Sequence, residues 1–348
     1  MASTQIVGVD IGFDTVRAVE VTGVGTNKPS VTRFFSLALP EGAVKNGEVL
    51  EINTVAAVLR QLWSTAKFSS KDVVLGIGNA KVLVRDLTVP KLSQSEIRES
   101  LPTHVQEMLP VPVGEALLDF YPISESSTES GPVVNGLLVA AIKDAVLANV
   151  KAVQLAGLTP VGVDLIPFAL MRLTSTARMV GNVAHIDIGA RTTNVIVTTG
   201  GVPQFVRILA NGGQDVTNAI EDRLSISRAE AENLKRSVGY SGAHATAEQA
   251  ELVSIVREVT GVLLSSLRNT LGYFANTRQN EPYSGIVLSG GGAQLFGFAD
   301  ALSEMTRIPV VLGDTFGSIN VAKDAARGTQ SQLGLNVALG LALGGAAA

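Results

Sequence analysis

Apolar positions near the N-terminus follow the two-residue period of strands and then the longer period of a helix. Residues 5–12 and 15–23 predict two strands joined by a tight turn near Gly12, and residues 30–40 predict a third strand. Ile52, Val55, Leu59, Leu62, Trp63 and Ala66 recur at helical spacing, so residues 52–66 predict an amphipathic helix. Residues 72–78, "DVVLGIG", predict a buried strand.

This β-β-β-α-β order recurs later in the chain. Residues 185–209 again predict three strands around an Asp-Ile-Gly turn, and residues 213–225 predict a helix. The first turn reads "VGVDIG" and the second "AHIDIG". The pattern indicates a duplicated domain rather than a solenoid.

The first half carries an insertion. It begins with a strand at residue 83, and a capping box of Ser93 and Glu96 then predicts a helix interrupted near Pro102. Residues 124–132 predict a polar loop between two strands, and residues 143–157 a helix that Gly157 ends.

The second half carries helices between its repeated strands. Ser227 and Glu230 predict a second capping box, and a long helix is expected at about 248–278. Residues 284–305 predict a strand, a glycine turn and a helix, and residues 333–348 a buried helix with a frayed tail.

Composition excludes several classes of function. The 348 residues carry a net charge of −4, so no electrostatic feature favours nucleic acid. Cysteine is absent, which excludes disulfides, cysteine-ligated metals and thiol nucleophiles and suits a reducing compartment. The first residues lack the basic start and the apolar stretch that are typical of a signal peptide. The sequence has no uninterrupted run of about 18 apolar residues, so no transmembrane helix is predicted.

The two Asp-Ile-Gly turns are candidate phosphate-binding sites. A glycine at such a turn lets backbone amides approach an anion, but Asp10 and Asp187 would repel phosphate unless a cation lies between. Mg²⁺ is the natural cation, because it bridges carboxylates and phosphates through water. Nearby hydroxyl and cationic groups that could also contact phosphate are Thr15, Thr192, Thr193, Arg17 and Arg191. One such turn is an ordinary structural feature, whereas two copies in matching contexts favour function.

Gly290, Gly291 and Gly292 form a third candidate, a flat backbone surface between a strand and a helix that could accommodate a purine or a phosphate. Other nucleotide and hydrolase signatures are missing: there is no GxxxxGK[ST], no complete GxGxxG and no GxSxG. His104, His185 and His244 are too scattered for a local metal motif, and His185 is expected in the core.

The order of these three motifs resembles the actin/Hsp70/sugar-kinase superfamily. Within it, the chain resembles the PilM family of type IV pilus assembly proteins, relatives of FtsA. The resemblance rests on "DIG…VRAVEV", on the insert "LTVPKLSQSEIRESLPTHVQEMLPVPVGEALLDFYPI", on "AEAENLKRSVG" and on "LGLNVALGLAL". It covers essentially the whole chain, and the insert is more specific than the superfamily motifs. Type II secretion has related platforms, so the pilus assignment rests on this resemblance.

The resemblance implies an α/β, actin-like, two-lobed fold of duplicated ribonuclease-H-like domains with an FtsA-type inserted subdomain. The implied division is 1A at 1–84 and 157–181, 1C at 85–156, 2A at 182–223 and 280–348, and 2B at 224–279.

The resemblance also implies ATP and Mg²⁺ between the lobes. Asp10 and Asp187 would organise Mg²⁺ through water, and Glu232 and Lys235 would reach the ribose or base. The remaining nucleotide-binding residues are expected to be Gly12, Phe13, Asp14, Thr15, Arg17, Gly189, Ala190, Arg191, Thr192, Thr193, Gly213, Gly290, Gly291, Gly292 and Gln294.

Phe13 and Asp14 depart from the family, which commonly has small hydroxyl residues there, and Asp14 adds negative charge beside the phosphates. No residue is identified as a base that activates water, so the catalytic residues are unknown and at most weak ATPase activity is expected.

The implied partner is the cytoplasmic N-terminal tail of a PilN-like inner-membrane protein, bound in a groove between 1A and 1C. Other pilus assembly ATPase or platform proteins, and self-association, are further expected contacts. The expected location is cytoplasmic, at the inner face of the membrane through that protein partner, since no Lys or Arg follows Arg327 to form a basic membrane helix.

Two alternatives stay open. A small-molecule kinase of the superfamily would need an aspartate base, for which Asp164 is the candidate, although a structural role suits it better. A polymerising FtsA-like protein would form ATP-dependent filaments.

Overall fold

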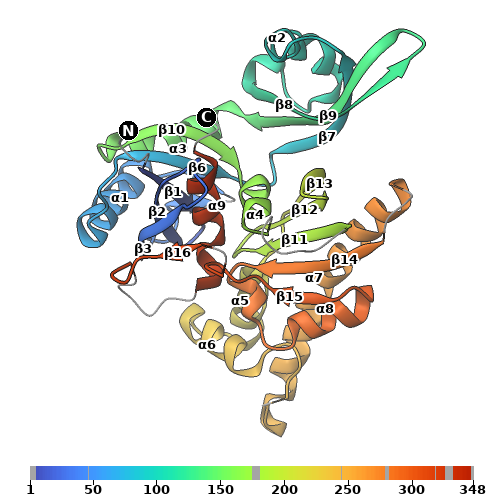
Figure 1. The fold of residues 1–348 in the computed structure, drawn as a ribbon. Coiled ribbons are helices and arrows are strands. Elements are labelled where there is room, and N and C mark those ends of the chain that lie inside the picture. The colour runs from blue at the N-terminus through green and yellow to red at the C-terminus, as the bar shows by residue number, and fades with distance from the viewer. Residues whose placement is uncertain are drawn as a thin grey trace.

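A computed structural model shows two lobes, each built on a mixed sheet, with an inserted unit projecting from the first lobe (Figure 1). The structure describes residues 5–45, 47–174, 181–243, 245–278, 282–317, 319–325 and 332–345. His244 and the end of the expected frayed tail, residues 346–348, lie outside these ranges.

The first sheet has helices on both faces. Its strand order is β10 (Thr159–Leu165), β6 (Asp72–Ile77), β1 (Gln5–Ile11), β2 (Thr15–Thr22), β3 (Ser30–Ala38) and β16 (Asn320–Val321). Val7 and Val9 point to one face, where they pack in a core with α1 (Ile52–Ala66) and α3 (Lys143–Leu155). Ile6 points to the other face, where α4 (Ile166–Thr174) and α9 (Asn336–Gly344) lie. Burial on both faces explains why β1 is apolar rather than alternating.

Close packing of α9 on β1 depends on Gly8. A Cβ at Gly8 would lie 1.9 Å from the carbonyl oxygen of Ala338, so any side chain there would push the helix away. Figure 1 shows α9 (red) beside the blue strands of the first lobe.

The second sheet repeats the pattern of the first. Its order is β13 (Val202–Leu209), β12 (Thr193–Thr199), β11 (Asn182–Ile188), β14 (Tyr283–Ser289) and β15 (Val310–Leu312). In both sheets the first strand of the repeat pairs antiparallel with the next strand and parallel with the strand after the helix. The predicted duplication is therefore confirmed.

Helices of the second lobe follow the expected order. They are α5 (Gly213–Leu224), α6 (Arg228–Val238), α7 (Ala250–Thr277) and α8 (Phe298–Thr306). At the start of α6, the Ser227 side chain accepts from the amide of Glu230, which is one half of the predicted capping box. The predicted glycine turn does not lead directly into a helix: a 3₁₀ turn, Gly292–Gln294, separates it from α8.

The insert has a sheet of its own, in the order β7 (Leu83–Pro90), β9 (Gly131–Ile142) and β8 (Ala116–Thr128). The capping box at Ser93 opens α2 (Gln94–Val105) as predicted. The predicted interruption at Pro102 is wrong, because Pro102 lies within α2. A proline removes one helical hydrogen bond, and packing of the buried residues Ile97, Leu101 and Val105 holds the helix together.

The predicted polar loop at 124–132 is also wrong in extent. β8 and β9 continue to Thr128 and Gly131, so only Glu129 and Ser130 form the turn. Polar side chains can stabilise a hairpin through cross-strand hydrogen bonds, and here Asn135 Nδ2 donates to Ser126 Oγ at 2.8 Å.

Contacts differ from the expected division of the chain in two places. The division puts residues 85–156 in the insert, but α3 packs against α1 in the core of the first lobe. It puts residues 280–348 in the second lobe, but β16 pairs with β3 and α9 packs on β1. The subdomain boundaries themselves stay a prediction.

Candidate functional site between the lobes

The two Asp-Ile-Gly turns have the same local geometry. The amide of Gly12 donates to the carbonyl of Thr15 at 3.0 Å, and the amide of Gly189 donates to the carbonyl of Thr192 at 2.9 Å. The first turn belongs to the β1–β2 hairpin and the second to the β11–β12 hairpin. Both turns line one cleft of about 1070 Å³ between the lobes.

Nearly all the residues predicted from the sequence meet in this cleft. Those that line it are Asp10, Gly12, Phe13, Asp14, Thr15, Arg17, Asp187, Gly189, Ala190, Arg191, Thr192, Gly213, Glu232, Lys235, Gly290, Gly291, Gly292 and Gln294. Thr193 is not among the lining residues. It is fully buried, and its hydroxyl donates to the carbonyl of Asn211 at 2.8 Å. Thr193 begins β12, and one step of strand alternation turns it away from the cleft.

Asp10 and Asp187 are buried carboxylates at the ends of β1 and β11. Burial raises the pKa of Asp187 to about 6; the Ser289 hydroxyl, which donates to Asp187 Oδ1 at 2.8 Å, opposes the rise, and nearby Asp10 adds to it. Burial also raises the pKa of Asp10, against the effect of Arg17, whose Nη1 lies 3.5 Å from Asp10 Oδ2. Arg17 therefore offsets part of a concentrated negative charge.

These carboxylates suit a magnesium ion held through water. Within the described ranges no three His, Cys, Asp or Glu side chains gather as a metal cage. Mg²⁺ rarely uses such a cage: it binds one or two carboxylates together with waters and substrate phosphates. Asp10 and Asp187 provide two carboxylates beside the two glycine turns of the cleft.

Glu232 and Lys235 of α6 form a partly buried polar network. Lys235 Nζ donates to Glu232 Oε2 at 2.5 Å, to Thr217 Oγ1 at 2.9 Å and to the carbonyl of Gly213 at 3.1 Å. Burial lowers the pKa of Lys235 although Glu232 opposes it. The pKa of Glu232 is lowered, because hydrogen bonds from Lys235, Thr217 and Arg236 outweigh its burial. The network presents a fixed set of polar groups to the cleft.

Gly290 is required by its backbone. Its φ of +85° is costly for other residues, and a Cβ there would lie 2.4 Å from the carbonyl oxygen of Ile188. The glycine turn thus packs directly on the second hairpin. With Gly291 and Gly292 it offers a side-chain-free surface to the cleft.

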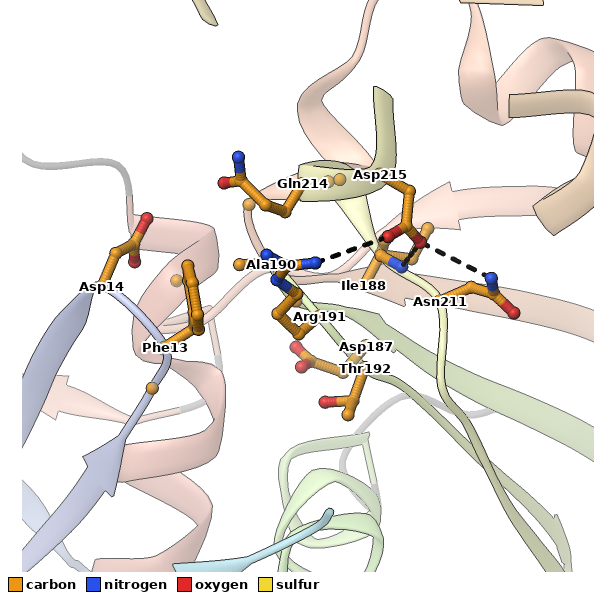
Figure 2. A pocket seen from close by; sticks show the side chains of 18 of the residues that line it. Phe13, Asp14, Asp187, Ile188, Ala190, Arg191, Thr192, Asn211, Gln214 and Asp215 are labelled. Carbon is orange, nitrogen blue, oxygen red and sulfur yellow. Dashed lines mark hydrogen bonds and ion pairs between the residues drawn. The ribbon is translucent and has the colours of Figure 1, made fainter. Parts of the chain in front are cut away.

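Phe13 and Asp14, the two departures from the family pattern, are at the tip of the first hairpin (Figure 2). Asp14 Oδ1 accepts from the hydroxyl of Thr15 at 2.9 Å. The Phe13 ring lies 4.8 Å from the guanidinium carbon of Arg191 and 5.4 Å from that of Arg228.

Sequence reasoning missed several residues of the site. Ser289 bonds Asp187, and Asp215 accepts from the Gly212 amide at 3.0 Å and lies 4.0 Å from Arg191 (Figure 2). Ser289 directly precedes the glycine turn, and Asp215 is the third residue of α5, so both positions had a local signal. No local sequence signal marked Arg228, because this residue reaches the cleft only through the packing of α6.

Asp164 and His185 have structural roles. Asp164 on β10 pairs with Arg172 of α4 and accepts from the amide of Leu165, and it does not line the cleft. Burial lowers the pKa of His185 to about 4, and its Nε2 bonds Thr198 Oγ1 at 3.1 Å. The structural roles expected for both residues are confirmed.

The described helices include none that is both long and apolar enough to span a membrane.

Comparison with known proteins places the chain in a family. The family profile described as "Type IV pilus assembly protein PilM" matches residues 8–346. The chain belongs to the PilM family. A solved structure titled "PilM-PilN type IV pilus biogenesis complex" is 28% identical, with a TM-score of 0.85, and the match covers 98% of each chain. The predicted family and fold class are thereby confirmed.

More distant relatives share the superfamily. FtsA of Bacillus subtilis is 23% identical over 68% of this chain and 58% of its own length. FtsA of Borreliella burgdorferi is 27% identical over 38% of this chain and 36% of its own length. The PilM-family chain thus spans less than two thirds of these curated relatives. A structure of MreB 5 of Spiroplasma citri, titled as bound to AMPPNP, shares the fold at 13% identity, a TM-score of 0.54, and 97% and 94% coverage.

Proposed function

We propose that this PilM-family chain is a nucleotide-dependent cytoplasmic platform of pilus assembly. It binds ATP with Mg²⁺ in the cleft, turns it over slowly or not at all, and binds the cytoplasmic tail of a PilN-like membrane protein. The observation that carries the nucleotide part is the meeting of two glycine turns and two buried carboxylates in one cleft.

Each part of a Mg-nucleotide has a counterpart in the cleft. Bound Mg²⁺ would neutralise phosphate charge, and Asp10 and Asp187 would hold it through water. Amides and hydroxyls of the two hairpin turns would contact the phosphates, with Arg17 as a cation beside them. The Glu232–Lys235 network would face the ribose or base, and the glycine turn would pack against the adenosine. MreB shares the fold alone; the geometry of this cleft supports the proposal.

Three carboxylates of the cleft support slow turnover, because each already has a hydrogen-bonding or ionic partner. Asp10 is paired with Arg17, Asp187 accepts from Ser289, and Glu232 is held by Lys235 and Arg236. A general base must be free to take a proton from water. The site therefore suits a nucleotide that acts as a structural or switching ligand.

A nucleotide-retention experiment tests this part. The protein is loaded with ATP and Mg²⁺, separated from free nucleotide, and the bound nucleotide is identified by chromatography over hours. We expect wild type to retain ATP and Asp187→Asn to lose it, while Asp222→Asn, an exposed aspartate on α5, behaves as wild type. Failure of wild type to retain nucleotide, or to show binding by calorimetry, would refute the proposal. Repeated conversion to ADP would refute slow turnover.

The partner proposal rests on the 28% identical PilM-PilN complex and on exposed apolar side chains near the insert. β10 is an outermost strand of the first sheet as described, and Val161 and Val163 are exposed on it. The adjacent α3 exposes Leu147, and β8 of the insert exposes Leu117. An extended peptide could add to such a strand edge and place its apolar side chains there.

Binding of a fluorescent peptide tests the partner proposal. The probe is the cytoplasmic N-terminal segment of the cognate PilN protein, followed by anisotropy. We expect Val163→Glu to weaken binding at least tenfold, because it places an unpaired charge in an apolar contact. Leu312→Glu, at an exposed position of β15, is the matched control and should bind as wild type. Equal affinity of all three proteins would exclude the β10 surface.

A further inference from the structure

Phe13 is held across the cleft by two cations. It is on the β1–β2 turn of the first lobe, whereas Arg191 is on the β11–β12 turn and Arg228 begins α6, both in the second lobe. The guanidinium carbons lie 4.8 Å and 5.4 Å from the ring centroid, within the range of cation–π attraction. The ring thus joins the lobes at the mouth of the proposed phosphate site.

A second contact supports the same junction. Arg228 Nη1 lies 3.2 Å from Glu41 Oε1, and Glu41 follows β3 in the first lobe. The start of α6 is therefore bound to the first lobe by an ion pair and by an aromatic ring. Both contacts would have to change for Arg228 to move.

Arg191 has hydrogen-bonding capacity to spare. Its Nε is buried with no acceptor in the described part of the chain, and its contact with Asp215 is a long one of 4.0 Å. A buried guanidinium nitrogen without an acceptor is costly, and a phosphate oxygen is among the best acceptors for it. Arg191 faces the cleft that both hairpins line, so a terminal phosphate would supply that acceptor.

We propose that the Phe13 ring competes with the terminal phosphate of a nucleoside triphosphate for Arg191 and Arg228, and so sets the preference between triphosphate and diphosphate. This inference rests on nucleotide binding in the cleft. A triphosphate reaches the two arginines and displaces the ring. A diphosphate stops short of them and leaves the ring in place.

The strengths of the two interactions give the direction of the effect. Cation–π attraction is weaker than a charge-assisted hydrogen bond to phosphate, so the triphosphate can displace the ring. Breaking the attraction between the ring and the two arginines costs free energy, and this cost reduces the affinity for the triphosphate. Phe13 therefore weakens triphosphate binding and leaves diphosphate binding nearly unchanged, which a small hydroxyl residue at position 13 would not do.

Calorimetric titration with AMPPNP and with ADP, each with Mg²⁺, tests the proposal. Phe13→Ala should bind AMPPNP about tenfold more tightly, the factor expected for two partly exposed cation–π contacts, and ADP within about twofold of wild type. Phe13→Tyr keeps the ring and should keep the wild-type ratio of the two affinities. Tyr273→Ala removes an exposed ring on α7 outside the cleft and is the matched control.

Other outcomes are decisive in the opposite direction. Equal changes for both nucleotides would overturn the proposed discrimination, as would weaker AMPPNP binding by Phe13→Ala. If wild type and every variant bind neither nucleotide, the proposed function itself fails.

A distance measurement without nucleotide tests the contact between the Phe13 ring and the second lobe separately from nucleotide binding. The chain has no cysteine, so spin labels at Gln61→Cys in the first lobe and Asp222→Cys in the second report the distance between lobes. Without nucleotide, Phe13→Ala combined with Glu41→Gln, which also removes the ion pair to Arg228, should shift or broaden this distance relative to Glu41→Gln alone, and Phe13→Tyr in the same background should not. An unchanged distribution would show that the ring does not hold the lobes.

Discussion

We expect the negative charge of the Asp187 carboxylate to destabilise the folded protein when no ligand is bound. The carboxyl is 8% exposed, and burial raises its pKa from 3.8 to about 6. The unfolded chain ionises this group more readily than the folded chain, so the contribution of Asp187 to stability is most favourable below pH 3.8 and is lost as pH rises through about 6. A shift of about two units corresponds to about 3 kcal/mol at pH 8 and about 1.5 kcal/mol at pH 5.

Asp187→Asn removes the charge and keeps an oxygen that can accept from Ser289. We therefore expect this variant to be more stable than wild type by about 2–3 kcal/mol at pH 8, with the difference falling by about half at pH 5. Urea unfolding in the presence of a chelator measures this difference in stability, provided that the unfolding free energies of the two proteins depend on urea concentration with the same slope. Asp222→Asn, an exposed control, should change stability by less than about 0.5 kcal/mol.

The opposite sign would refute the reasoning. If Asp187→Asn is less stable than wild type at pH 8, the carboxylate must be stabilised in the folded state more than its burial penalises it. A pH-independent difference would mean that the substitution acts through packing. The expected gain in stability, together with loss of ATP retention, would identify Asp187 as a residue kept for a ligand at a cost to stability.

Three further predictions concern other parts of the fold. Glu20 is fully buried and accepts from Thr32, from the amides of Ser69 and Ser70 and from Arg33, so Glu20→Gln should cost about 2–4 kcal/mol in urea unfolding, and a loss below about 1 kcal/mol would contradict this. Gly290→Ala should lower the free energy of unfolding by at least about 1–2 kcal/mol and should reduce the amount of nucleotide that the protein retains. A Cβ at Gly291 meets no other atom, so Gly291→Ala should be well tolerated in the same unfolding assay. Ser93→Ala should cost about 1 kcal/mol and expose the first amides of α2 to hydrogen exchange, while exchange that is unchanged there would show that the cap is dispensable.

Much of the fold was predictable because its signals are local. The helix at 52–66 has the predicted bounds, and the hairpins around Gly12 and Gly189 lie where apolar strands meet a glycine. Predictions were wrong where contacts with other elements outweighed a local rule. At Pro102 packing outweighed the proline rule, and at 124–132 strand pairing outweighed a polar composition typical of loops.

The candidate site was predictable as a set of residues but not as an arrangement. Every residue predicted for the site lines the cleft except Thr193, because strand ends, glycine turns and the family resemblance mark such positions in the sequence, whereas Asp215 and Arg228, which also line it, were missed. The direction of a side chain next to a turn depends on a single step of alternation. That step separates Thr192, which lines the cleft, from Thr193, which is buried beneath it.

The sequence by itself determined the repeat, the insert and the family of this protein, since each is a pattern of neighbouring residues that needs no knowledge of distant ones. Only the tertiary structure decided which groups face each other across the lobes. It placed Phe13 beside Arg191 and Arg228, and Glu41 beside Arg228. Such contacts join residues far apart in the chain, and their geometry depends on the packing of every element between them.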